Sequence, residues 1–188
     1  MMNKYKGKFR IPTARLKSWD YGANALYFVT ICTANKSCYF GTIAEGEVLL
    51  SDLGRLANAY WLEIENKFSI TILDHVVMPN HIHGMINIDK KLIIDNRKDV
   101  IKHEHKVLKV GGVTGDNNPM LHENLSRFIH WYKGRCTFEM RKIHPTFAWQ
   151  PRFHEHIIRD EASYLKIAEY IQNNPLKWEE DKYFNKGV

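Results

Sequence analysis

The sequence has few cysteines and no long apolar run, and both absences narrow the class of protein. The three cysteines, Cys32, Cys38 and Cys136, are odd in number and lack the C-x-x-C spacing of zinc and redox sites. This argues against a disulfide framework and favours a reducing compartment. No apolar run approaches the ~20 residues that span a bilayer, and the N-terminus has no apolar signal-peptide core. We therefore expect a cytoplasmic protein with no membrane partner.

The sequence does contain ample core material and a modest positive charge. Its 188 residues are 44% hydrophobic and 12% aromatic, which suits one folded domain. The formal net charge of +6 permits nucleic-acid binding without requiring it. Basic side chains gather before the first acid, Asp20, and suit a phosphate backbone, although a solvated terminus has the same composition. They are Lys4, Lys6, Lys8, Arg10, Arg15 and Lys17.

The spacing of apolar residues predicts an α+β fold. Four segments rich in β-branched and aromatic residues predict strands, at 25–33, 69–78, 81–89 and 153–159. Two segments with apolar residues every three or four positions predict amphipathic helices, at 51–68 and 121–143, the first capped by Ser51. A last helix runs from a cap at Asp160 to about Asn173, and residues 35–50 form a small hairpin or loop.

The order of these elements is β-α-β-β-α-β followed by one more helix. This is the order of a ferredoxin-like antiparallel sheet with helices on one face. We divide the chain into a basic arm (1–24), a domain (25–178) and a polar tail (179–188). Within the domain, residues 90–119 are charged and polar, and we interpret them as an inserted loop.

The motif His81-Ile82-His83 carries the strongest chemical signal. Residues i and i+2 of a strand point to the same face, so both imidazoles project together and form a ready pair of metal ligands. An isolated H-x-H is more often a pair of solvent-facing polar residues. The following Gly84 favours the ligand interpretation, because a glycine leaves room for the backbone of a bound molecule. His154 and His156 repeat the spacing and are candidate reserve ligands or phosphate contacts.

Two histidines hold a metal weakly, and the final predicted helix offers a third group. Tyr170 and Asn174 are four residues apart and therefore lie on one side of that helix, at the flank of its apolar stripe. Taken singly, the tyrosine is equally explained as a half-buried anchor and the Asn-Asn-Pro sequence as a helix stop.

The two motifs together resemble the single-tyrosine HUH transposases, and in particular the REP-associated tyrosine transposases. The resemblance extends along most of the chain, through YFVTICT (27–33), VVMPNHIHG (76–84), FAWQPRFHEHIIRDE (147–161) and YIQNNPLKW (170–178). By this resemblance His81 and His83 match the HUH pair, Tyr170 matches the catalytic nucleophile, and Asn174 matches the polar third ligand. The segment 90–119 is less typical of the family.

The resemblance implies a metal-dependent single-strand DNA nickase and ligase that acts on hairpins or palindromic repeats. A divalent metal, Mg²⁺ or Mn²⁺, would be held by His81, His83 and Asn174, and Tyr170 would form a 5′-phosphotyrosine. Relatives work as monomers or as homodimers, and the residues do not decide between these. DNA contacts are expected from the basic arm and from three further residues, Arg127, Lys133 and Arg152.

Two alternatives stay open at the level of sequence. The first is a domesticated hairpin-DNA-binding protein that keeps the fold but has lost catalysis. The second is a metal-dependent hydrolase of another class, which would use a water nucleophile. That second class normally has more histidine or aspartate ligands close to the H-x-H motif than this sequence shows.

Overall fold

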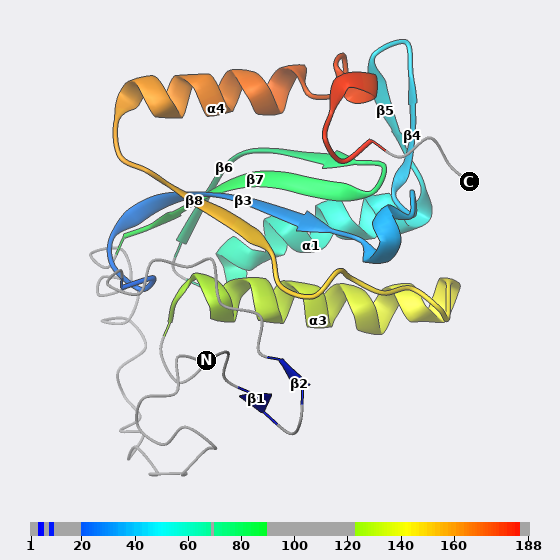
Figure 1. Ribbon diagram of the computed structural model, residues 1–188, viewed down its shortest axis with the longest axis horizontal. Coiled ribbons are helices and arrows are strands. Elements are labelled where there is room, and N and C mark those ends of the chain that lie inside the picture. Colours follow the sequence, from blue (N-terminus) through cyan, green and yellow to red (C-terminus); the bar gives the residue numbers. More distant parts are fainter. Residues whose placement is uncertain (1–3, 6–7, 10–19, 69, 90–122, 185–188) are drawn as a thin grey trace.

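The computed structural model describes residues 4–5, 8–9, 20–68, 70–89 and 123–184 (Figure 1). The predicted insert at 90–119 lies outside these ranges, as do Lys6, Arg10, Arg15 and Lys17 of the basic arm. Within the arm, two short strands, β1 (Lys4–Tyr5) and β2 (Lys8–Phe9), pair antiparallel.

A four-stranded antiparallel sheet forms the centre of the molecule, as predicted. Its strands are β3 (Ala25–Cys32), β6 (Ile70–Met78), β7 (His81–Ile88) and β8 (His154–Ile158), in the spatial order β6-β7-β3-β8. Every neighbouring pair is antiparallel. The first and third strands of this sheet in chain order, β3 and β7, therefore lie at its centre, which is the ferredoxin-like arrangement that the element order predicts.

Helices cover both faces of this sheet, but unequally (Figure 1). Helices α1 (Asp52–Lys67) and α3 (Leu125–Ile143) lie together on one face, and α4 (Glu161–Asn173) lies alone on the other. The large core cluster fills the space between the sheet and the α1–α3 layer and includes Tyr27, Trp61 and Ile82. The cluster under α4 is much smaller, and its buried members are Met85, Ile158, Ala168 and Ile171.

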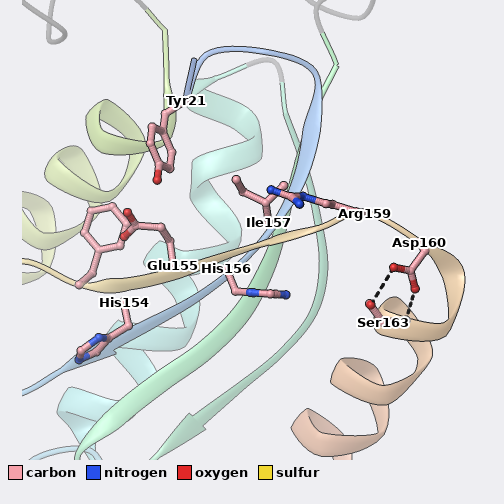
Figure 2. A pocket seen from close by; sticks show the side chains of 9 residues that line it. Tyr21, His154, Glu155, His156, Ile157, Arg159, Asp160 and Ser163 are labelled. Atoms are coloured by element: carbon pink, nitrogen blue, oxygen red, sulfur yellow. Dashed lines mark hydrogen bonds between the residues drawn. The ribbon is translucent and has the colours of Figure 1, made fainter. Parts of the chain in front are cut away.

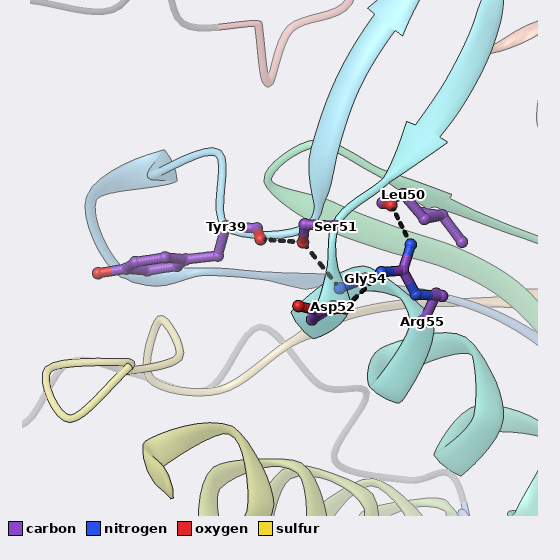
Figure 3. A network of polar contacts seen from close by, with 6 residues as sticks. All are labelled: Tyr39, Leu50, Ser51, Asp52, Gly54 and Arg55. Atoms are coloured by element: carbon purple, nitrogen blue, oxygen red, sulfur yellow. Dashed lines mark hydrogen bonds and ion pairs between the residues drawn. The ribbon is translucent and has the colours of Figure 1, made fainter. Parts of the chain in front are cut away.

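Side-chain caps fix where the helices begin. At α1, the Ser51 hydroxyl accepts a hydrogen bond from the Gly54 amide at 3.1 Å and donates one to the Tyr39 carbonyl at 2.6 Å. Arg55 donates a hydrogen bond to the Leu50 carbonyl and forms an ion pair with Asp52, one turn earlier in the helix (Figure 3). The predicted caps at Ser51 and Asp160 are both confirmed.

The segment between β3 and α1 was predicted as a hairpin or a loop, and a hairpin forms. It consists of β4 (Gly41–Ala44) and β5 (Glu47–Leu50), preceded by the short helix η1 (Ala34–Lys36). The predicted helix at 121–143 begins at Leu125 in the described residues, because Asn124 caps it. A last short helix, η4 (Trp178–Glu180), follows α4. Among the described residues, no helix has the length and apolar character needed to cross a membrane.

Candidate active site

His81 and His83 project together from β7 toward α4, as their spacing predicts. Their ring centroids are 4.4 Å apart, and the side chains are 0% and 1% exposed. Ile82, between them, points into the large core on the other face. The pair is therefore a buried constellation and not two solvent-facing polar residues.

Hydrogen bonds fix the orientation of both rings. Nδ1 of His81 lies 2.8 Å from Oδ1 of Asn80, and Nδ1 of His83 lies 2.8 Å from the Thr30 hydroxyl. Because an amide oxygen only accepts, Nδ1 of His81 carries the proton, and Nε2 keeps its lone pair. That Nε2 is buried and has no hydrogen-bond partner among the described residues. An oriented imidazole with a free Nε2 is the form that binds a metal.

Burial also keeps both rings neutral. It lowers the pKa of His81 to about 3, and the positive charges of Lys182 and Lys36 act in the same direction. Burial lowers the pKa of His83 well below its usual value, helped by the neighbouring His81. At neutral pH both rings are therefore uncharged, which is the charge state from which an imidazole binds a metal ion.

These depressed pKa values predict an acid-sensitive fold. In the unfolded chain His81 binds a proton below its usual pKa of 6.5, but in the folded chain it does so only near 3. Acid therefore favours the unfolded state, and the free energy of unfolding falls as pH drops from 6.5 toward 3. For this group the slope is up to about 1.4 kcal/mol per pH unit. Urea denaturation of the metal-free protein at several pH values measures it, and His81→Gln should flatten the dependence. An unchanged slope in that variant would contradict the assignment.

Tyr170 and Asn174 both reach the histidine pair from α4. The Tyr170 hydroxyl lies 3.1 Å from Nε2 of His83, and its ring packs at 5.1 Å from that imidazole. The Asn174 side chain is buried at the C-cap of the helix. Its Oδ1 atom is also buried without a hydrogen-bond partner among the described residues. The structure thus gathers the four predicted site residues at one place.

Asp181 is a further member of this group that the sequence analysis missed. Its Oδ2 atom accepts hydrogen bonds from the Tyr170 hydroxyl at 3.0 Å and from Nδ2 of Asn174 at 2.9 Å. Ligand atoms of His81, His83 and Asp181 all lie within 4.8 Å of one another. The only signal was a set of three aromatics, Trp178, Tyr183 and Phe184, in an otherwise largely polar segment, since such aromatics predict a tail packed on the domain. Tyr183 indeed packs 4.7 Å from the His81 ring.

These donors fit a divalent metal ion. Two neutral imidazoles, a carboxylate and an amide oxygen form the mixed nitrogen and oxygen set that borderline divalent ions accept. Nε2 of His81 and Oδ1 of Asn174 are buried without a hydrogen-bond partner among the described residues, which costs free energy, and both are atoms of the kinds that ligate metals. A bound cation would remove that cost.

The Tyr170 hydroxyl is held in its protonated form. Burial raises its pKa well above the usual value, and the negative charge of Asp181 raises it further. The hydroxyl proton is directed at Asp181, so that carboxylate is the acceptor placed nearest to it.

Gly84 does not have the role that the sequence analysis gave it. We expected it to leave room beside the histidines, but alternation along β7 points it to the opposite face. A Cβ atom there would lie 2.3 Å from Cζ2 of Trp61 on α1. Gly84 therefore permits close packing of α1 on the sheet, and the expectation of a ligand cradle was wrong.

This contact predicts a stability change in one direction. Gly84→Ala should lower the free energy of unfolding by about 1–3 kcal/mol, because Trp61 is fully buried and cannot move aside without strain. The matched control is Gly134→Ala on α3, where a Cβ atom meets nothing within 4 Å. That change should stabilise the helix by up to about 1 kcal/mol. Equal urea midpoints for the two variants would contradict the packing argument.

The basic residues predicted to bind DNA are not gathered at the histidine pair. Lys133 and Arg152 lie together in a cavity of about 1180 Å³ between α3 and residues 148–155. The Lys133 ammonium donates to the carbonyls of Gln150 and Arg152, and burial lowers its pKa to about 8. The Arg127 guanidinium lies over the Phe68 ring at 5.8 Å. Of the six basic residues of the arm, only Lys4 and Lys8 lie in the described ranges, and only their backbone is described.

Comparison with solved structures identifies the fold of the chain. No protein-family model matches the chain. A solved REP-associated tyrosine transposase bound to a REP hairpin superimposes with a TM-score of 0.57 and 18% sequence identity. The match covers 91% of this chain and 77% of that one. The chain therefore has the fold of a REP-associated tyrosine transposase, as the motifs predicted.

Comparison of sequences identifies the family to which the chain belongs. A protein of Haemophilus influenzae, described as uncharacterized, is 35% identical over 187 residues, which is 98% of this chain and 99% of the relative. The chain belongs to the same family as this protein.

Proposed function

We propose that the protein is a metal-dependent single-stranded DNA endonuclease and strand transferase that works through Tyr170. The observation that carries this proposal is the 3.1 Å approach of the Tyr170 hydroxyl to Nε2 of His83, within a buried, neutral histidine pair. A tyrosine that only anchors a helix does not require its hydroxyl to contact a buried histidine.

In this proposal a divalent ion, Mg²⁺ or Mn²⁺, is held by His81, His83 and Asn174, with Asp181 within reach. When bound, such an ion supplies charge neutralisation and polarisation of a phosphate. The protein residues supply position: Asn80 and Thr30 orient the two rings, and α4 presents Tyr170 beside them.

The covalent step exchanges one phosphate ester for another. The Tyr170 oxygen forms a bond to phosphorus while the bond from phosphorus to the 3′ oxygen breaks, which leaves a 5′-phosphotyrosine and a free 3′-hydroxyl. The Tyr170 proton passes to Asp181, and the leaving oxygen takes up a proton. Because the new ester conserves the phosphodiester bond, attack by another 3′-hydroxyl rejoins a strand without ATP.

The proposed substrate class follows from the structural similarity to the REP-associated tyrosine transposase. The solved relative is bound to a REP hairpin. We extend this to hairpin or palindromic repeat DNA for the present chain. The basic arm and the cavity that holds Lys133 and Arg152 are the candidate surfaces for the duplex part.

Covalent capture of DNA tests the proposal. Hairpin oligonucleotides with single-stranded flanks, labelled on the 5′ or the 3′ side, are incubated with the protein and Mn²⁺ or EDTA and run on a denaturing gel. We expect a metal-dependent adduct that keeps only the 3′-side label, and a mass shift on the peptide that contains Tyr170. Retarded binding without an adduct, across a panel of hairpins from near the gene, would favour the catalytically silent DNA-binding protein.

A further inference from the structure

A second polar pocket adjoins the histidine pair on the same face of the sheet. In the strand register, His83 of β7 is paired with Thr30 of β3, and Thr30 is paired with His154 of β8. His154 is thus two strands from His83, or about 10 Å at the usual spacing of strands. His154 therefore lies beside the proposed reaction centre, on the edge strand of the sheet.

The pocket is lined mainly by cationic and aromatic groups. Its volume is about 380 Å³, within the range that accommodates one small ligand. It is lined by Phe28, Thr30, Lys36, His154, Glu155, His156, Lys182 and Tyr183. The side chains of His154 and His156 point to one face of β8, whereas Glu155, the acid among these residues, points to the other (Figure 2). The wall facing the pocket therefore carries two lysines and two imidazoles.

The pocket and the histidine pair share three residues. The Thr30 hydroxyl binds Nδ1 of His83, and the Phe28 ring stacks on the same imidazole with centroids 5.2 Å apart. Tyr183 contacts both places, since its ring lies 4.7 Å from His81 and 6.4 Å from His154. A DNA strand bound at the histidine pair can therefore extend directly into this pocket.

We propose that this pocket binds the nucleotide next to the scissile phosphate, which deepens and rests on the proposed function. Lys36, Lys182 and His154 contact the phosphate, and Phe28 offers a ring for the base. A neutral or a protonated imidazole can donate a hydrogen bond to a phosphate oxygen. Stacking of bases on aromatic rings beside a cationic groove is how single strands are held without sequence preference.

Binding measured without cleavage tests this subsite. In a Tyr170→Phe background, a fluorescein-labelled DNA hairpin with thymidine tails is titrated by anisotropy. We expect His154→Ala to weaken binding about tenfold, as loss of one charge-assisted hydrogen bond does, and His154→Lys to restore it. The control is His144→Ala, an exposed histidine at the C-cap of α3, on the opposite face of the sheet and outside both proposed DNA-binding pockets. Equal affinity for His154→Ala and His144→Ala would overturn the proposal.

A phosphate scan locates the contact. Each tail phosphate is replaced in turn by a neutral methylphosphonate, and we expect one replacement to weaken binding to the parent about tenfold and not to weaken binding to His154→Ala further. Additive losses at every position would overturn the subsite. The two proposals fail separately: an adduct with no effect of His154 contradicts only the pocket, whereas His154-dependent binding without an adduct contradicts only the endonuclease.

Discussion

Tyr170→Phe is expected to abolish the covalent protein–DNA adduct, with a loss of at least about 10³-fold in the rate of its formation. The phenyl ring can keep its packing against His83 and Phe28, but it has no oxygen to bond to phosphorus. The measurement is the yield of adduct on a denaturing gel over time, at saturating DNA and Mn²⁺. Affinity for the same hairpin, measured by anisotropy, should change little, because the ring and the metal ligands remain.

The matched control is Tyr164→Phe on the same helix. Tyr164 is half-buried in the small cluster under α4, so this change removes a hydroxyl from α4 at a distance from the histidines. It should leave adduct formation within about twofold, and a loss equal to that of Tyr170→Phe would show that α4 is merely sensitive to substitution. An adduct retained in Tyr170→Phe would contradict the assignment and favour a water nucleophile.

The double variant His81→Ala/His83→Ala is expected to lose the response to Mn²⁺ entirely. Mn²⁺ that binds only the folded state stabilises it by about 2.7 kcal/mol at one hundred times its dissociation constant. We therefore expect Mn²⁺ to raise the thermal midpoint of the wild type and to leave that of the double variant unchanged. Adduct formation should fall below detection in the same variant.

The thermal readout is independent of catalysis, so it tests the metal site even if no DNA substrate has been found. Both imidazoles are buried, so their loss leaves a cavity that destabilises the fold. Circular dichroism of the metal-free double variant is therefore measured first, to check that it folds. His130→Ala serves as the control that retains the metal response. A wild-type midpoint that ignores Mn²⁺ would contradict the metal site itself.

The sheet and the helices were predictable because the residues that form them repeat with a regular period. The run of β-branched residues in β6 and β7 and the apolar stripe of α1 follow from the strand and helix periods alone. The same rule placed His81 and His83 on one face and Tyr170 beside Asn174. These relations join residues two or four positions apart, and over that distance the geometry of a strand or a helix alone determines which side chains share a face.

What the sequence could not show are contacts between distant segments. Asp181 reaches the site through η4, and no period links it to Tyr170, eleven residues earlier. Gly84 was misjudged because Trp61, which occupies the space beside it, is on another element. Composition alone does not identify the neighbour of a glycine, so both an empty cradle and a tightly packed contact were compatible with the motif.

The unequal size of the two hydrophobic clusters has a consequence for how the site can open. β7, which carries the histidines, is an inner strand packed on the large cluster, whereas α4 rests on the small one. Elements with little buried apolar contact open at a lower free energy than the core, so amide protons of α4 should exchange with solvent before those of β7. In the proposed mechanism the nucleophile would thus sit on a part of the fold that can undock and return while the two histidines stay in register, and a DNA strand attached to Tyr170 would be carried away from them without global unfolding.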